Sequence, residues 1–205
     1  PEVDALKLNA VKLCQKLNLI DVTQYEEREK IIRELFGSAG ENPVVLPVFN
    51  CDNGKNIHVG NTFLANYNVT ILDIMEVQIG DYVMIGPNTL ITTVNHPLNP
   101  MGRRKHLGIG KPVKIGNDVW IGGNVTILPG VTIGNNVVIA AGAVVTKDIP
   151  DNAVAVGRLA NKIRKFGFLT SRFTPEITAR QVNAAANTAK NVIAQRIVGS
   201  LCVSQ

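Results

Sequence analysis

Aliphatic residues recur at every sixth position through the second half of the chain. They stand at Ile115, Ile121, Ile127, Ile133, Ile139 and Val145, and Ile79, Ile85 and Ile91 have the same phase upstream. This period fits neither an amphipathic helix, with about 3.6 residues per turn, nor an alternating β-hairpin. It predicts short strands joined by regular corners and stacked as coils around an aliphatic core.

The residue after each repeated aliphatic position is small in most repeats, as at Gly80, Gly116, Gly122 and Gly134. We expect these small residues to let the chain bend sharply at the corners. A second small or branched residue follows four positions after the first and is expected to point inward as well. Each coil would then pair its backbone with the next coil at about 4.8 Å.

The repeat is interrupted between Ile91 and Ile115, where residues 94–111 contain Pro97, Pro100 and the basic cluster Arg103-Arg104-Lys105. We interpret this stretch as a loop ejected from the coils, and loops of this length inside a compact domain are usually functional. Three segments are therefore expected: N-terminal helices in residues 1–42, coils in residues 43–157 with a loop at about 94–111, and a C-terminal segment with a helical tail in residues 158–205.

Composition excludes several classes of protein. With 45% hydrophobic residues, the chain can bury a full core and is not of the disordered class. The net charge of +5 is spread out, so nucleic acid is not favoured over a small phosphorylated ligand. Cys14, Cys51 and Cys202 do not suggest a disulfide framework. No apolar run is long enough to span a bilayer, and we expect a cytoplasmic protein.

Further motifs accompany the repeat: EEREKIIRELFG at 26–37, CDNG at 51–54, ANYN at 65–68, NHP at 95–97, GKPVKIGNDVWIGG at 110–123, PGV at 129–131 and VVTKDIP at 144–150. Over residues 1–166 the chain thereby resembles the maltose and galactoside O-acetyltransferase group of the hexapeptide-repeat acyltransferases. The resemblance implies an all-β core, a left-handed parallel β-helix with short N-terminal helices and a protruding loop. It also implies acetyl-CoA as co-substrate, no metal, and a homotrimer with active sites between subunits.

The same resemblance implies two catalytic residues. His96 matches a histidine that acts as general base, and imidazole suits this role because its ordinary pKa is near neutrality. Asn66 matches an asparagine that binds substrate and stabilises the transition state, where a donor is needed for the developing oxyanion. Without the resemblance, His96 could be an ordinary loop histidine and Asn66 an ordinary corner residue.

We expect three residues on the acceptor side of the site: Asp52, Asp73 and Trp120. A carboxylate at Asp52 can accept two hydroxyl hydrogen bonds. Asp73 lies beside the position of a further acceptor carboxylate in relatives, which Ile74 occupies in this chain. We expect Trp120 at a corner, either in a subunit contact or in a wall of the active site.

For the donor, the resemblance places Gly123 and Ala141 along the pantetheine arm of coenzyme A and Thr146, Lys147 and Arg164 near its nucleotide end. Lys147 and Arg164 suit phosphate as point charge and as fork, respectively. Gly157 to Ala160 and Asn161 depart from the usual family sequence, so fewer phosphate contacts are expected.

Other functions remain open at this stage. A hydroxyl compound of xenobiotic origin could replace the sugar as acceptor. His58, His96 and His106 equal the number of ligands in a zinc carbonic anhydrase of this fold, although their spacing argues against one. A non-catalytic binding protein could also use these repeats.

Overall fold

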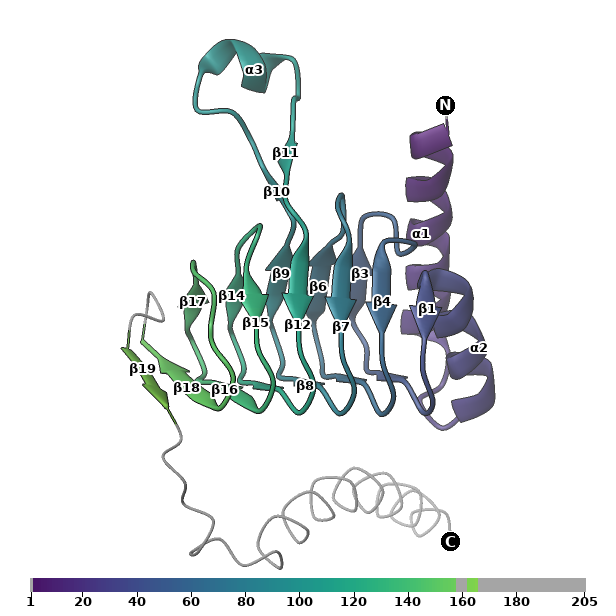
Figure 1. Ribbon diagram of the computed structural model, residues 1–205. Coiled ribbons are helices and arrows are strands. Elements are labelled where there is room, and N and C mark those ends of the chain that lie inside the picture. The colour runs from purple at the N-terminus through teal and green to yellow at the C-terminus, as the bar shows by residue number, and fades with distance from the viewer. Residues whose placement is uncertain (1, 158–161, 166–205) are drawn as a thin grey trace, which may run out of the picture. The chain divides into compact units, whose positions relative to one another are not determined.

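The computed structural model describes residues 2–157 and 162–165, and these form a parallel β-helix with three flat sides (Figure 1). Sheet A contains β1 (Ser38–Ala39), β4 (Ile57–Val59), β7 (Val77–Ile79), β12 (Val113–Ile115) and β15 (Thr132–Ile133). Sheet B contains β2 (Val44–Val45), β5 (Leu64–Ala65), β8 (Met84–Ile85), β13 (Trp120–Ile121), β16 (Val137–Ile139), β18 (Ala153–Val156) and β19 (Lys162–Lys165). Sheet C contains β3 (Phe49–Cys51), β6 (Val69–Leu72), β9 (Leu90–Thr92), β14 (Thr126–Ile127) and β17 (Val144–Val145).

Up to β17, the strands of sheets A, B and C follow one another along the chain in that order, and neighbours within these three sheets are parallel except where β19 returns along β18. This topology confirms the stacked coils that the sixfold period predicts. The C-terminal stretch in which a helical tail is expected lies outside the described residues.

The repeated aliphatic positions fill the inside of the coils. Ile121, Ile127, Ile139 and Val145 have no exposed surface, and the second positions at Val125, Val137 and Ala143 are equally buried. Because parallel pairing superposes the inward residues of successive coils, as Ile121 pairs with Ile85 and Ile139, the core is a continuous column of branched side chains.

The corners bend for a different reason from the one expected. Gly80, Gly116 and Gly134 are not in the left-handed region. Instead, a Cβ on Gly116 would lie only 2.8 Å from the backbone of Gly134 in the next coil, so these glycines are required by close approach. The bend comes two residues later, at non-glycine residues with positive φ. At the corner between sheets A and B these are Asn42, Thr62, Tyr82, Asp118, Asn136 and Asn152.

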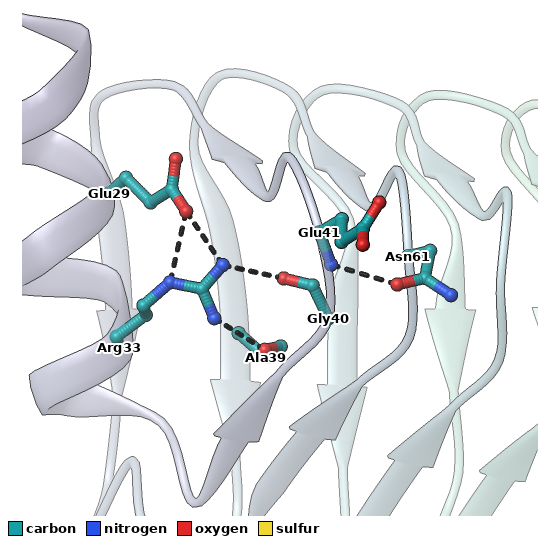
Figure 2. A network of polar contacts seen from close by, with 6 residues as sticks. All are labelled: Glu29, Arg33, Ala39, Gly40, Glu41 and Asn61. Atoms are coloured by element: carbon teal, nitrogen blue, oxygen red, sulfur yellow. Dashed lines mark hydrogen bonds and ion pairs between the residues drawn. The ribbon is translucent and has the colours of Figure 1, made fainter.

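The same corner carries a ladder of side-chain hydrogen bonds, referred to below as the Asx ladder. A side-chain oxygen in each coil accepts the backbone N–H of the equivalent residue in the coil before it. The oxygens belong to Asn61, Asp81, Asn117, Asn135 and Asp151, at distances of 2.7 to 2.9 Å. The ladder begins at Glu41, and close by Arg33 of α2 (Tyr25–Leu35) donates to the carbonyl oxygens of Ala39 and Gly40 (Figure 2).

Helices α1 (Glu2–Leu19) and α2 cover the N-terminal end of the coils, as expected (Figure 1). Arg28 of α2 is buried, and its guanidinium donates to the carbonyl oxygens of Leu17, Ile20 and Val45, which joins both helices to β2. Cys14 of α1 and Cys51 of β3 are free thiols with sulfur atoms 3.6 Å apart, whereas Cys202 lies outside the described residues. Within the part of the chain described, no helix is both long and apolar enough to cross a membrane.

The corner between sheets C and A is irregular. From Cys51 to Val59 and from Ile71 to Ile79 the chain takes two residues more than the six between Ile79 and Ile85. In the third coil the same corner contains the loop at residues 94–111, in which β10 (Val94–Asn95) pairs antiparallel with β11 (Ile109–Gly110) around α3 (Pro100–Arg104). Three successive insertions therefore lie side by side along the upper edge of the solenoid in Figure 1, and the loop stands away from it.

Candidate active site

The loop that carries His96 is held in shape by its own hydrogen bonds. Besides the β10–β11 pairing, the Asn99 side chain caps α3 by accepting the Gly102 N–H at 2.7 Å. The Arg103 guanidinium donates to the carbonyl oxygens of Pro97 and Leu98. The segment that follows β10 is thus tied to α3, which fixes the backbone on either side of His96.

His96 is exposed, and its Nδ1 lies 2.9 Å from the carbonyl oxygen of Leu107. A carbonyl oxygen only accepts, so Nδ1 must carry the proton. The neutral ring then keeps its lone pair on Nε2, the atom that can take a proton from a substrate. Sequence reasoning did not find Leu107, because a backbone carbonyl that orients a side chain leaves no signal in residue type.

Asp52 and Asp73 lie at the same corner as this loop, two coils and one coil before it, respectively. Asp52 is half-buried; burial raises the pKa of its carboxyl, and the charge of Lys7 on α1 opposes this. Asp73, which we expected to bind the acceptor, is not open to a substrate. Its side chain has no exposed area, and its carboxylate accepts the backbone N–H groups of Asp52, Asn53 and Asn56.

Asn66, Gly123 and Ala141 lie at a second corner, between sheets B and C. Asn66 Oδ1 accepts the Tyr67 N–H at 2.7 Å, so Nδ2 is the end of the amide that is available to donate. Gly123 and Ala141 occupy equivalent places in adjacent coils because Ile121 pairs with Ile139. No described atom lies within 4 Å of a Cβ placed on the neighbouring Gly142, so the surface of this corner is open.

Thr146 and Lys147 follow β17 and therefore lie at the corner between sheets C and A, two coils beyond the His96 loop. Lys147 is exposed and Thr146 is half-buried. The backbone of Arg164 lies in β19, opposite Val154 of β18. The side chain of Arg164 is outside the described part, so its predicted contact with phosphate stays a prediction.

Trp120 is not at a corner, contrary to expectation. It is in β13 on the outer face of sheet B, where it is 54% exposed and pairs with Met84 and Val138. The inward partner in this strand is Ile121, so the alternation of a strand forces Trp120 outward. The pairing continues this outer row in both directions as Val44, Leu64, Met84, Trp120, Val138 and Val154.

The predicted site residues thus form two groups on opposite edges of sheet C. His96, Asp52, Thr146 and Lys147 lie at one edge, and Asn66, Gly123 and Ala141 at the other. The strands and turns that separate the edges span six or more residues, a distance on the order of 15 Å. Since the reacting atoms of one acetyl transfer must lie within a few ångströms of both groups, one chain by itself does not bring His96 and Asn66 together.

The three histidines do not gather either. His58 lies on the outer face of sheet A, with its Nδ1 3.0 Å from Ser38 Oγ, while His96 and His106 belong to the loop. Among the described residues there is no group of three His, Cys, Asp or Glu side chains placed to hold a metal ion.

Comparison with known proteins gives the family. The model of bacterial transferase hexapeptides (six repeats) matches residues 112–147, and that of the maltose acetyltransferase hexapeptide capping motif matches residues 1–40. Galactoside O-acetyltransferase of Escherichia coli K12 is 44% identical over 78% of this chain and 78% of its own length.

Two solved structures are also similar to the chain. A maltose O-acetyltransferase from Clostridium difficile 630 is 49% identical, with a TM-score of 0.75 over 79% of this chain and 85% of that one. A hexapeptide-repeat acetyltransferase from Vibrio cholerae complexed with acetyl coenzyme A is 40% identical, with a TM-score of 0.74 over 81% and 88%. With its solenoid, its helical cap and these matches, the chain belongs to the hexapeptide-repeat acyltransferases, in the group of the maltose and galactoside O-acetyltransferases.

Proposed function

We propose that this enzyme transfers the acetyl group of acetyl-CoA to a hydroxyl of a sugar, directly and without an acetyl-enzyme intermediate. The observation that carries the proposal is the 2.9 Å contact between His96 Nδ1 and the carbonyl oxygen of Leu107. Because the Nδ1–H group donates to Leu107 O, Nε2 is left free to act as the base, on a loop that stands away from the solenoid (Figure 1). Similarity to enzymes named for galactoside and maltose supports a sugar as the acceptor.

In this mechanism Nε2 of His96 removes the proton of the acceptor hydroxyl as its oxygen attacks the thioester carbonyl. The carbonyl oxygen gains negative charge, and the Nδ2 group of Asn66 donates to it. When the tetrahedral intermediate collapses, the bond between carbon and sulfur breaks, and the proton on His96 passes to the sulfur of coenzyme A. His96 is thereby returned to its neutral form.

Coenzyme A would lie along the corner that holds Gly123 and Ala141. Small side chains and open space at Gly142 leave room there for a pantetheine arm. The charges of Lys147 and Arg164 suit the phosphates at the nucleotide end, with Lys147, which lies at the other edge of sheet C, contributed by the neighbouring chain of the trimer proposed below. Support comes from the similar Vibrio cholerae enzyme, whose structure contains acetyl coenzyme A.

We also propose a homotrimer in which His96 of one chain faces Asn66 of the next. The separation of the two groups across sheet C requires a second chain if both act on one acetyl group. The outer row of sheet B supplies a suitable contact face, since Val44, Leu64, Met84, Trp120, Val138 and Val154 make it apolar over the length of the solenoid.

The activity is tested with acetyl-CoA and a panel of acceptors that includes galactose, maltose, glucose and a non-sugar alcohol, scored by release of free thiol. We expect turnover with at least one sugar and ordered or random kinetics through a ternary complex. A burst of acetylated enzyme would contradict direct transfer, and turnover with the non-sugar alcohol alone would contradict the sugar acceptor.

The shared site is tested by mixing two inactive variants. His96→Ala and Asn66→Ala are each expected to be inactive, but chains exchanged between them form some interfaces with both side chains intact. Activity should therefore return on mixing after partial denaturation and reassembly. If it does not return although mixed trimers form, both residues act within one chain.

A further inference from the structure

The buried carboxylate of Asp73 organises the loop before it in space. Oδ1 accepts the N–H of Asp52 at 3.0 Å and that of Asn53 at 2.9 Å, and Oδ2 accepts the N–H of Asn56 at 3.3 Å. The backbone oxygen of Asp73 accepts from the side-chain amides of Asn53 and Asn56 at 3.1 and 2.7 Å. One residue in the second coil therefore holds three backbone N–H groups and two side-chain amides of residues 52–56 in the first coil.

The number of N–H groups that Asp73 accepts can be compared with the number accepted by each side chain of the Asx ladder. At the corner between sheets A and B, each side chain accepts one backbone N–H, and Asn and Asp alternate freely in the role. Asp73 accepts three N–H groups with two oxygens. An amide would replace one of these acceptor oxygens by a donor, so Asn does not substitute for Asp here.

The side chain of Asp52 projects from the loop that Asp73 holds. Asp52 remains half-exposed at the corner from which the His96 loop leaves two coils later, whereas Asp73 has no exposed area. Thr93 holds the corner between them in the same manner, since its hydroxyl donates to Leu72 O and accepts the N–H of Met75. The three insertions are thus fixed to one another by buried side chains.

We infer that Asp73 is a positioning residue for the acceptor: it does not touch the acceptor but holds residues 52–56 so that the Asp52 carboxylate is presented toward the His96 loop. The inference rests on the proposed function, because it assigns Asp52 to acceptor binding. Ile74 stands where relatives have an acceptor carboxylate. In this inference its neighbour Asp73 binds the backbone of the loop and not the substrate.

The test compares Asp73→Asn with Asp81→Asn, a matched change at the Asx ladder, where Asn already does the same work in other coils. Steady-state kinetics would use acetyl-CoA with galactose or maltose, whichever the wild type acetylates faster. Asp73→Asn should raise the acceptor KM roughly tenfold or more, as expected for a displaced binding group. The KM for acetyl-CoA should stay within about twofold, and Asp81→Asn should change neither constant.

A double variant separates positioning from a general loss of structure. If Asp73 acts through Asp52, then adding Asp73→Asn to Asp52→Asn should leave the acceptor KM of the single Asp52→Asn variant unchanged, because the two residues share one effect. Independent, multiplied effects on KM would overturn the inference. An unchanged acceptor KM in Asp73→Asn alone would do so as well.

Asn56→Ala keeps the test sound if Asp73→Asn does not fold. It removes the side-chain donor to Asp73 O and Ile74 O but leaves the carboxylate and all backbone N–H groups. The acceptor KM should rise in the same direction by a smaller factor, and no rise would count against the inference. If the wild-type protein acetylates no sugar, the proposed function is refuted. This outcome differs from those that would overturn the inference on Asp73, which require an active wild-type enzyme.

Discussion

Two corners of the same solenoid differ in regularity and in purpose. At the corner between sheets A and B, the coils from Gly40 to Gly134 repeat a close-packed glycine, a residue with positive φ two positions later and a rung of the Asx ladder. At the corner between sheets C and A, three successive coils contain insertions, among them the loop of His96. The regular corner satisfies its own polar groups, so few of them are free for a ligand. The irregular corner presents side chains outward.

The contrast between the two corners indicates where functional residues lie in a repeat protein. Residues that obey the repeat stabilise the stack, since each rung depends on its neighbours. Residues that depart from it lengthen a corner and place side chains beyond the surface of the prism. The following predictions test this division: changes at exposed residues of the irregular corner should reduce activity and leave stability unchanged, and changes at the regular corner should do the reverse.

The largest effect is expected from His96→Ala at the irregular corner. Loss of the base should lower kcat by at least about a hundredfold, within the usual range for general base catalysis. Affinity for acetyl-CoA and the melting temperature should stay near the wild-type values, because His96 is exposed and outside the coil core. Thiol release and isothermal titration with acetyl-CoA measure the two. Retained turnover would remove His96 from the mechanism.

The next largest effect is expected from Gly116→Ala at the regular corner. The added Cβ would stand 2.8 Å from the backbone of Gly134 and from Asn135 Oδ1, so adjacent coils must separate. Overpacking of this kind costs about 1–3 kcal/mol of the free energy of unfolding. Denaturant unfolding should show the loss, while the kcat of the folded fraction stays unchanged. A stability equal to that of the wild type would mean that the coils separate at no cost.

A single rung of the Asx ladder should contribute less. Asn117→Ala leaves the backbone N–H of Asp81 without its acceptor at 2.8 Å and should lower the free energy of unfolding by about 1 kcal/mol. Asn117→Asp is the matched control, since a carboxylate oxygen accepts the same N–H and Asp already occupies this position at Asp81 and Asp151. Equal losses in both variants would show that the hydrogen bond is not what the ladder contributes.

The smallest effect expected is a pH dependence of stability at Asp73. Burial raises the pKa of its carboxyl above the ordinary value of 3.8, and the N–H groups of Asn53, Asp52 and Asn56 oppose this only in part. Between pH 3.8 and the raised pKa, folding therefore takes up a proton. The contribution of Asp73 to the free energy of unfolding is largest below this pH range and is lost as the pH rises through it.

Thermal unfolding of wild type and Asp73→Asn from about pH 7 to about pH 4 measures this difference. The melting temperature of the wild type should gain on that of the variant as the pH falls. Carboxyls common to both proteins cancel in the comparison. A difference that is constant, or that shrinks toward low pH, would contradict a raised pKa.

The sequence predicted the core and the loop correctly but misassigned the role of the glycines, and each outcome has a physical reason. The sixfold period predicted which side chains are buried, from Ile79 to Ile149, because a stacked coil has only one inside. It also predicted the loop, since Pro97 and Arg103 stand where the sixfold period from Ile91 would require inward aliphatic residues. It assigned the glycines to bending, although Asn, Thr, Tyr and Asp residues take the positive φ and the glycines accommodate the next coil.

By itself, then, the sequence determined the coils, their core, the helical cap and the position of the His96 loop along the chain, because these follow from local spacing and side-chain volume. The tertiary structure decided what depends on residues from different coils. In the folded chain, Leu107 O lies at hydrogen-bond distance from Nδ1 of His96, and Asp73 is buried under the loop that contains Asp52. Trp120 lies on the outer face of sheet B, and His96 and Asn66 lie on opposite edges of sheet C. Such contacts arise from the register between distant segments, which no single stretch of residues encodes.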